Sequence, residues 1–287
     1  MSTLYLVATP IGNLEDITLR ALRILRSVPL IAAEDTRQTR KLLTHYEITT
    51  PLTSYHEHNK AHKTAELVRQ LAAGDLALVS DAGTPVINDP GYELVQAALQ
   101  AGHTVVPIPG PSAPLAALIA AGLPADAFLY LGYLPRRAAE RRTLLQQVAA
   151  LPYTLIFLET PHRLLDALGD LRAELGNRNM AAARELTKLH EEIWRGSLDE
   201  ARTRFETTPP KGELTLVVAG HTPPQGARWP VDVLRAEISA ALSRGEAPSR
   251  LARRLAGQSG WPRREIYTLL TNVSPSDDPP GESSDQP

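Results

Sequence analysis

Short apolar runs alternate with amphipathic segments along the first half of the chain. Four runs are rich in aliphatic residues and have the length of buried strands: 4–8, 30–33, 76–79 and 105–108. Segments with apolar residues at helical spacing follow these runs: 17–25, 64–73, 92–99 and a stretch that ends at residue 121. Strands that alternate with helices predict a mostly parallel sheet. We expect residues 128–133 to form its fifth strand.

A break at Leu134-Pro135-Arg136-Arg137 separates this pattern from a second one. Beyond the break, helical spacing covers residues 138–151 and 164–175. Strand-like runs cover residues 153–158, 180–183, 192–194 and 214–219. The connections have both hairpin and crossover lengths, so this second sheet is expected to be mixed. The pattern as a whole predicts an α/β protein with two lobes.

The last part of the chain has a different character. A Pro- and Gly-rich linker over residues 221–230 leads to three helical segments, 231–243, 249–256 and 263–271. The last two flank a turn and resemble a helix-turn-helix. Residues 273–287 hold almost nothing apolar and are expected to be disordered. We therefore predict an N-terminal α/β domain (1–134), a second α/β domain (135–222), a helical module (229–272) and an acidic tail (273–287).

Composition is that of a soluble globular protein, with 43% apolar and 22% charged residues. Cysteine is absent, which excludes disulfides, thiolate metal sites and a cysteine nucleophile. No signal peptide is evident and no apolar stretch approaches the roughly 20 residues of a membrane span, so a cytoplasmic location is expected. The net charge of −2 conceals a basic segment, because residues 228–272 hold eight Arg and four acids. Such a segment is compatible with a polyanionic partner.

Three loops combine Pro, Gly and small polar residues directly after expected strands: 9–13, 80–85 and 109–113. Because parallel strands end at the same edge of a sheet, these loops are expected to lie together and to form a ligand site. The glycine spacings of a P-loop or a dinucleotide fingerprint are not present. A cleft of backbone carbonyls, small side chains and one acid, Asp81, suits a cationic or zwitterionic ligand better than a phosphate.

Eight motifs occur in a distinctive order along the chain. They are Thr9-Pro10-Ile11-Gly12-Asn13, Ala33-Glu34-Asp35-Thr36-Arg37, Tyr55-His56-Glu57-His58-Asn59, Ser80-Asp81-Ala82-Gly83-Thr84-Pro85, Pro109-Gly110-Pro111-Ser112, Glu159-Thr160-Pro161-His162-Arg163, Ala183-Arg184-Glu185-Leu186-Thr187-Lys188 and Lys211-Gly212-Glu213-Leu214. Over roughly residues 4–272 the chain closely resembles the ribosomal RNA small-subunit methyltransferase I family. That family belongs to the tetrapyrrole-methylase-like (class III) S-adenosylmethionine-dependent methyltransferases.

The resemblance implies a bilobal fold with S-adenosyl-L-methionine in the cleft between two α/β domains, and a homodimer. It also implies methyl transfer to the 2′-oxygen of cytidine 1402, at the decoding site of 16S rRNA in the small ribosomal subunit. By similarity, the cofactor contacts are Pro10, Gly12, Asp81, Gly83, Thr84, Gly110, Ser112 and Ala113 from the first domain. Glu159, Leu186 and Gly212 are the corresponding contacts from the second domain.

The reaction needs few special residues, because a sulfonium already carries an activated methyl group. A ribose hydroxyl is a weak nucleophile, so a carboxylate or imidazole near its proton would help. Candidates for that base are Asp35, His56, Glu57 and Asp81. Arg37, Asn59 and Lys60 are candidates for positioning the phosphodiester.

Several of these residues also allow a structural interpretation. The Glu34–Arg37 motif could be a helix N-cap with a local ion pair. Glu159-Thr160-Pro161 could cap the next helix, with Pro161 at its first position. His58 and His62 have the spacing of a metal pair, but no third ligand is suggested and no metal site is expected.

The C-terminal helices carry a cluster of cationic side chains: Arg250, Arg253, Arg254, Arg263 and Arg264. We expect these residues to bind RNA phosphates, and a solvated face of a helical bundle is the alternative. Two other functions stay open. One is a methylase of the same superfamily that acts on a tetrapyrrole, another small molecule or a modified protein side chain. The other is a non-catalytic RNA- or ribosome-binding protein.

Overall fold

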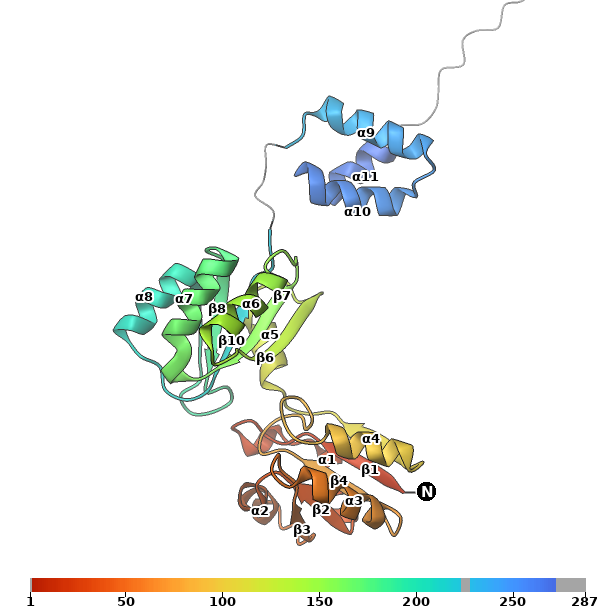
Figure 1. Cartoon of the computed structure of the whole chain (residues 1–287), viewed down its shortest axis with the longest axis vertical. Helices are drawn as coiled ribbons and strands as arrows, with labels where there is room; N and C mark the ends of the chain where they lie inside the picture. The colour runs from red at the N-terminus through yellow and green to blue at the C-terminus, as the bar shows by residue number, and fades with distance from the viewer. Residues whose placement is uncertain (1, 223–227, 272–287) are drawn as a thin grey trace, which may run out of the picture. The chain divides into compact units, whose positions relative to one another are not determined.

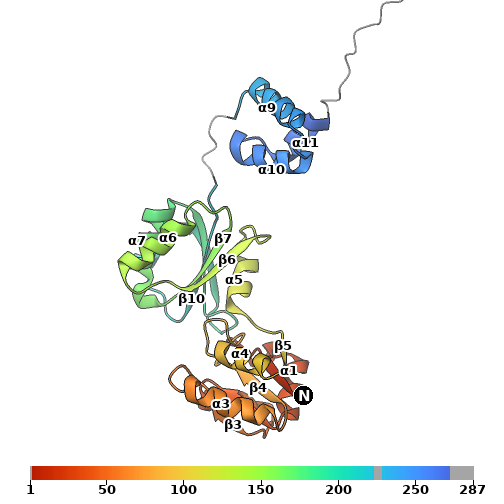
Figure 2. The same cartoon turned by 45° about the vertical axis from the view of Figure 1, so that its right-hand side comes forward.

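The computed structural model describes residues 2–222 and 228–271 (Figures 1 and 2). Two compact units, Met1–His221 and Thr222–Pro287, divide the chain, and each is described by itself. The expected acidic tail and residues 223–227 of the expected linker lie outside the described residues. No helix in the described ranges has the length and apolar character needed to cross a membrane.

The first sheet contains five strands in the order β3-β2-β4-β1-β5. Their bounds are β1 (Thr3–Val7), β2 (Leu30–Ala33), β3 (Leu52–Ser54), β4 (Leu76–Val79) and β5 (Thr104–Ile108). All four strand pairs are parallel, which confirms the parallel sheet predicted from the alternating pattern. The three-residue edge strand β3 was not predicted, because it is too short to show a period.

Helices cover both faces of this sheet. One face packs against α1 (Leu19–Ser27) and α2 (Thr36–His45), and the other against α3 (Lys60–Leu71) and α4 (Tyr92–Gln100). Alternate strand residues serve the two layers, as the pleat requires: Ile31 and Val79 face α1 and α2, whereas Ala32 and Leu78 face α3 and α4. A short 3₁₀ turn, η1 (Leu14–Asp16), precedes α1.

The second sheet has the order β6-β7-β10-β8-β9. Its strands are β6 (Phe128–Tyr133), β7 (Thr154–Glu159), β8 (Asn179–Arg184), β9 (Glu192–Ser197) and β10 (Leu214–Val218). The β6–β7 pair is parallel and the other pairs are antiparallel, which confirms the expected mixed sheet. One face packs against α5 (Ala113–Ala121). The other packs against α6 (Ala138–Val148), α7 (Leu164–Leu175), which follows η2 (Pro161–Arg163), and α8 (Leu198–Thr207).

The prediction that residues 128–133 form the fifth strand of the first sheet was wrong. These residues form β6, which pairs with β7 at the edge of the second sheet. The preceding helix α5 packs on the same sheet, where Leu118 contacts the cluster around Ile156 and Val217. The chain therefore passes from one sheet to the other ahead of α5, upstream of the break expected at residues 134–137. An unbroken α/β alternation does not reveal such a change of sheet.

The second unit contains three helices in its described residues: α9 (Val231–Ser243), α10 (Pro248–Ser259) and α11 (Arg263–Thr271). Its core is formed by Leu234, Ile238, Leu251, Leu255 and Ile266, all fully buried. This small bundle matches the three helical segments expected from the sequence.

A buried ion pair fixes the turn that follows β6. The Arg141 Nε donates to Asp170 Oδ2 at 2.7 Å, and the two side chains are only 6% and 7% exposed. The same guanidinium donates to the Pro135 carbonyl, which also accepts from Arg163 Nη2 at 3.2 Å. A buried charge without its partner is costly, so this pair should matter more than the surface pairs of the same lobe.

We predict that Asp170→Ala lowers the free energy of unfolding by about 3 kcal/mol, because it leaves the Arg141 guanidinium buried and unpaired. Asp199→Ala is the matched control, since Asp199 also accepts from an arginine Nε at 2.7 Å but is half exposed. Its loss should cost less than about 1 kcal/mol. Urea denaturation followed by circular dichroism measures both, and equal losses would contradict the prediction.

Candidate active site

The three loops expected to form a ligand site lie together at one edge of the first sheet. Thr9 and Gly83 exchange backbone hydrogen bonds of 2.8 and 2.9 Å, so the loops after β1 and β4 are paired. The Thr84 hydroxyl donates to the Pro111 carbonyl at 3.2 Å, which attaches the loop after β5. These contacts join the three loops into one ledge.

Asp81 links this ledge to the end of β2. Its Oδ1 accepts a hydrogen bond from the Asp35 N–H at 2.8 Å, and its own N–H points to Glu34 Oε2 at 3.5 Å. The strands β2 and β4 are neighbours in the sheet, so their acidic loop tips meet. The carboxylate of Asp81 therefore has a positioning role in the fold as well as a place at the rim.

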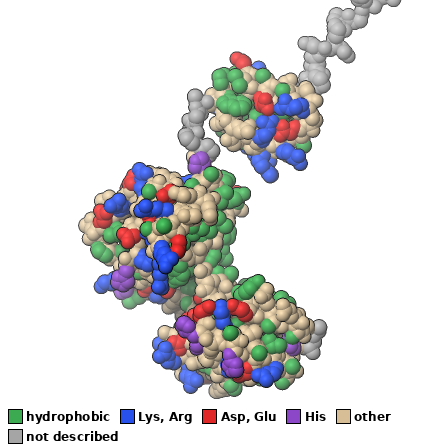
Figure 3. Space-filling model, viewed as in Figure 1, with side chains coloured by type: hydrophobic (Ala, Val, Ile, Leu, Met, Phe, Trp, Pro, Cys, Tyr) green, Lys and Arg blue, Asp and Glu red, His purple; other side chains and the backbone are tan. Residues whose placement is uncertain are grey.

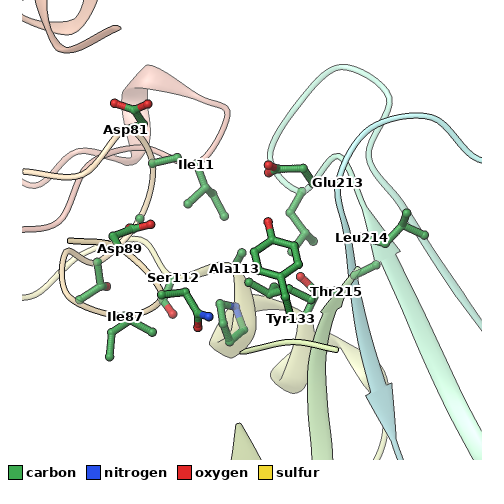
Figure 4. Close-up of a pocket in the computed structure, with 18 of the residues that line it drawn as sticks. Ile11, Asp81, Ile87, Asp89, Ser112, Ala113, Tyr133, Glu213, Leu214 and Thr215 are labelled. Carbon is green, nitrogen blue, oxygen red and sulfur yellow. The ribbon is translucent and has the colours of Figure 1, made fainter. Parts of the chain in front are cut away.

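A cavity of about 310 Å³ lies beside this ledge and is lined by residues from both sheets (Figure 4). From the first half of the chain, its walls include Ile11, Glu34, Asp81, Ala82, Gly83, Thr84, Ile87, Asn88, Asp89, Ser112, Ala113 and Pro114. From the second half they include Tyr130, Tyr133, Leu158, Ala183, Glu185, Leu186, Lys188, Glu213, Leu214 and Thr215. Six of the expected cofactor contacts are thus brought together: Asp81, Gly83, Thr84, Ser112, Ala113 and Leu186.

The other expected contacts are not among the residues that line the cavity. Gly12, next to Pro10, packs so closely against the loop after β8 that a Cβ would lie 2.8 Å from the Leu186 carbonyl oxygen. Gly212 has a φ of 81° and lies under the Glu185 side chain. Gly110 lies against Ala8. These glycines allow close approach of wall segments, and their contact with a cofactor stays a prediction.

Glu159 points away from the cavity. Its neighbour Leu158 lines the cavity, and alternate residues of a strand face opposite sides. The Glu159 side chain is fully buried, accepts from the Thr160 N–H at 2.8 Å and lies 3.4 Å from Arg163 Nη2. Burial raises its pKa. Pro161 is the first residue of η2, as the capping interpretation expects, but the side chain of the N-cap residue Thr160 makes no capping hydrogen bond.

The walls of the cavity are acidic. Five of its described lining residues carry carboxylates: Glu34, Asp81, Asp89, Glu185 and Glu213. Lys188 is the one lining residue with an amine, and it is paired with Glu185 at 2.9 Å. Burial raises the pKa of Asp89 to about 6, and the nearby Glu34 carboxylate adds to this. Burial likewise raises the pKa of Glu34 and of Asp81. The cavity therefore favours a cationic ligand.

Two tyrosines face these acids across the cavity. Figure 4 shows the Tyr133 ring between the loop of Asp89 and the loop of Glu213, while the Asp81 carboxylate points away from that ring. Burial raises the pKa of Tyr130 to about 12, with Tyr133 and Asp89 adding to it. Burial also raises the pKa of Tyr133. Both phenols stay neutral near pH 7 and can donate hydrogen bonds.

Backbone strain is concentrated beside the cavity. Val86 (φ 76°) and Asn88 (φ 64°) lie in the loop after β4, and Glu185 (φ 49°) and Thr187 (φ 65°) lie in the loop after β8. A positive φ is unfavourable for a β-branched residue such as Val86. Strained conformations of this kind cluster at functional sites, where the surrounding packing maintains them. The two loops that contain these strained residues, after β4 and after β8, both line the cavity.

The candidate base Asp35 is held by Arg37. It accepts from the Arg37 backbone N–H as the N-cap of α2, and from the guanidinium at 2.8 and 3.1 Å. These hydrogen bonds lower the pKa of Asp35 to about 2. The motif thus has the N-cap and ion pair of the structural interpretation, and such a carboxylate is a weak proton acceptor. Its catalytic role stays a prediction.

Most polar contacts of the histidine-rich segment after β3 are local and stabilise the turn that the segment forms. Asn59 accepts from the His56 N–H at 2.8 Å and donates to the Ser54 carbonyl. Lys60 pairs with Glu57 at 2.8 Å and with Glu93 at 2.6 Å. These residues do not line the cavity, although the His56 side chain is close enough to Glu34 to influence its carboxyl group. Among the described residues, no group of three His, Asp or Glu could hold a metal ion.

Sequence reasoning missed Asp89, Tyr130 and Tyr133 as site residues. Asp89 had a recognisable signal, since it opens an Asp-Pro-Gly turn between a strand and a helix. The tyrosines had none, because they lie on β6, which the alternating pattern assigned to the first sheet.

Comparison with known proteins identifies this architecture. Residues 3–202 match the family model of tetrapyrrole (corrin/porphyrin) methylases. A ribosomal RNA small subunit methyltransferase I from Synechocystis is 50% identical over 94% of this chain and 97% of its own length. The protein of the same name from Halalkalibacterium halodurans is 48% identical over 93% and 94%.

The fold is also found in uroporphyrin-III C-methyltransferase from Thermus thermophilus, solved in complex with S-adenosylhomocysteine (TM-score 0.53, 22% identity, 75% of this chain and 97% of that one). The fold and the family model thus define a class III methyltransferase that depends on S-adenosylmethionine. Within that class, the chain belongs to the ribosomal RNA small subunit methyltransferase I family.

We predict that Gly12→Ala weakens S-adenosylmethionine binding by roughly 10-fold, because overpacking costs on the order of 1–3 kcal/mol. The new Cβ would lie 2.5 Å from Lys188 Cγ and 2.8 Å from the Leu186 carbonyl, and would push the wall loop aside. Gly169→Ala is the control, since no described atom outside its own helix backbone and its chain neighbours lies within 4 Å of that Cβ. Titration calorimetry measures both, and wild-type affinity for Gly12→Ala would refute the prediction.

We also predict a pH dependence of cofactor binding that comes from Asp89. Its pKa of about 6 means that the carboxyl is mostly neutral at pH 5 and mostly ionised at pH 7. Affinity for the cationic cofactor should therefore rise with pH through this range, by up to about 10-fold. In Asp89→Asn the dependence should shrink and affinity should stay low.

Asp166→Asn, which removes an exposed acid on α7, serves as the control for this titration. It should keep the wild-type pH profile in calorimetry at pH 5, 6 and 7. An Asp89→Asn profile as steep as that of the wild type would assign the titration to another group, with Glu34 and Asp81 the nearest candidates.

Proposed function

We propose that the protein methylates the 2′-oxygen of the decoding-site cytidine of 16S rRNA, with S-adenosylmethionine as methyl donor. The observation that carries this proposal is the acid-lined cavity at the edge of the parallel sheet, in a chain that belongs to an rRNA methyltransferase family. Its relatives carry the small ribosomal subunit in their name, and we infer the same substrate here.

The residues of the cavity fit a cationic cofactor. When bound, S-adenosylmethionine supplies a methyl group activated on a positively charged sulfur. We propose that Asp89 and Glu213 face its positive charges and that Tyr130 and Tyr133 donate hydrogen bonds. Gly83, Thr84, Ser112 and Ala113 line the same cavity and leave room for close backbone contact. Partial burial of Asp89 strengthens its attraction for a positive charge, whereas Glu213 is exposed.

The rim of the cavity is the proposed place of the ribose. Asp81 is exposed, and its carboxylate points away from Tyr133. The Asp81 side chain therefore faces outward from the cavity. We propose that Asp81 and Glu34, each with a raised pKa, are better proton acceptors for the 2′-hydroxyl than Asp35. Arg37, 88% exposed, remains available to contact a phosphate next to the target.

The helical module is proposed as an additional contact for RNA. Arg250, Arg253, Arg263 and Arg264 are exposed. Arg254 differs, because its guanidinium pairs with Glu246 at 2.8 Å and Glu237 at 3.2 Å and so helps to join α9 to α10. We therefore assign phosphate binding to the first four arginines and a structural role to Arg254.

We propose in addition that the protein works as a homodimer. Helix α5 leaves Leu115 and Ile119 49% and 80% exposed, and Phe128 at the start of β6 is 41% exposed. Exposed apolar side chains of this kind are suited to contact with a second copy.

Incubation with small ribosomal subunits from a strain that lacks this activity, together with methyl-labelled S-adenosylmethionine, tests the proposed function. The label should map to one decoding-site cytidine, and the linkage to its 3′ neighbour should resist alkaline hydrolysis, because that cleavage needs a free 2′-hydroxyl. Label on a base, or on a tetrapyrrole or protein in a parallel incubation, would contradict the proposal. Asp89→Asn should lower labelling at pH 7, while Asp166→Asn should not.

A further inference from the structure

The two helices on one face of the first sheet are unusually basic. Helices α1 and α2 together contain six cationic side chains and no acid: Arg20, Arg23, Arg26, Arg37, Arg40 and Lys41. All six are exposed, whereas Ala21, Leu22, Ile24, Leu25, Leu42 and Leu43 of these helices pack into one core with the sheet. This α1–α2 face stands out in a chain whose net charge is −2.

The opposite face of the same sheet is different. There the lysines of α3 are neutralised, since Lys60 pairs with Glu57 and Glu93, and Lys63 pairs with Glu66. On the α1–α2 face, Arg37 pairs with Asp35, and within the described residues no other of the six cations has a carboxylate within 4.0 Å. A general preference for arginine in the chain does not explain this separation of charge.

The cations of α2 form a continuous stripe. Arg37, Arg40, Lys41 and Thr44 have the spacing i, i+3, i+4 and i+7, which places them along one side of a helix. Together with Thr36 they line a shallow groove on the surface of α2. In Figure 3, blue side chains lie at the edge of the lobe where Figure 1 labels α2.

The stripe leads to the rim of the active site. Arg37, at its first turn, holds Asp35, and the Asp35 N–H donates to Asp81 at 2.8 Å. Asp81 lines the cavity. A polyanion that follows the groove from Thr44 towards Arg37 therefore arrives at the acids that we propose to face the ribose.

We propose that the α1–α2 face binds the phosphates of the RNA strand that flanks the target nucleotide. This inference rests on the proposed function, since it gives the substrate strand a path to the rim. Arg40 and Lys41 contact successive phosphates, and Arg20 and Arg23 extend the positive field. The contacts are electrostatic and independent of base sequence, so they position the strand and leave base recognition to other groups.

Binding of a fluorescein-labelled decoding-region RNA hairpin to the full chain tests this, by anisotropy between 50 and 200 mM salt. Each lost phosphate contact should reduce the slope of log K against log salt by about 0.7–0.9. Arg40→Gln/Lys41→Gln should reduce it by about 1–2, and Arg20→Gln/Arg23→Gln should reduce it by a smaller amount. The control Arg172→Gln/Arg202→Gln removes two exposed cations of α7 and α8 and should keep the wild-type slope.

Two further measurements separate this inference from the proposed function. Calorimetry with S-adenosylmethionine should give wild-type affinity for both α1–α2 variants, which also verifies that they fold. A hairpin of unrelated sequence should show the same loss of slope. In one outcome, the α1–α2 variants lower the salt slope for both hairpins while the methyl label maps to a site other than the decoding-site cytidine. That result would contradict the proposed function and support RNA binding by the α1–α2 face. If Arg40→Gln/Lys41→Gln keeps the wild-type slope, or the wild-type chain binds neither hairpin, the inference is overturned.

Discussion

Two backbone hydrogen bonds between Thr9 and Gly83 maintain the geometry on which the active site depends. Strands β1 and β4 pair from Leu4 to Leu6, and these two bonds join the chains again beyond the ends of the strands. They fix the loop after β4 at the edge of the sheet. Asp81 precedes the anchored Gly83 in this loop, and Thr84 follows it. The strained residues Val86 and Asn88 follow directly, so the position of Asp89 depends on the same anchor.

This anchored ledge explains why a negatively charged cavity can exist in the protein. Acids that are half-buried near one another resist ionisation, which is why the pKa of Asp89 is raised to about 6. The energetic cost of gathering them is met by the hydrophobic packing of both lobes. We propose that the cationic cofactor relieves the repulsion between these acids when it binds.

Much of the fold followed from hydrophobic spacing alone. The parallel first sheet and the mixed second sheet were predicted, because their strands are short apolar runs that end at turn-forming residues. Helix α8 was not predicted, although Ser197 and Glu200 form a capping box, which is a sequence signal for the start of a helix. Residues 128–133 were assigned to the wrong sheet, because period and composition are alike for strands of either lobe. Which sheet a strand joins is decided by long-range pairing, here between Tyr130 and Ile156.

The site was predictable to the extent that it consists of loops. Gly83, Thr84 and Ser112 lie at the cavity because each follows a parallel strand, and strand direction is visible in the alternating pattern. Glu159 shows the limit of that reasoning, since a shift of one residue along β7 decides whether a side chain faces the cavity or the core. Tyr130 and Tyr133 reach the site only through the tertiary position of β6.

Hydrogen exchange with and without S-adenosylmethionine tests most directly whether the cofactor occupies a cavity shared by the two sheets. We expect the ligand to slow exchange together in residues 80–91 of the first lobe and in residues 183–188 and 212–215 of the second. The helices α3 and α8, which do not line the cavity, should be unchanged. Protection confined to the loops of one lobe, or strongest outside both sets of loops, would contradict a shared cofactor site.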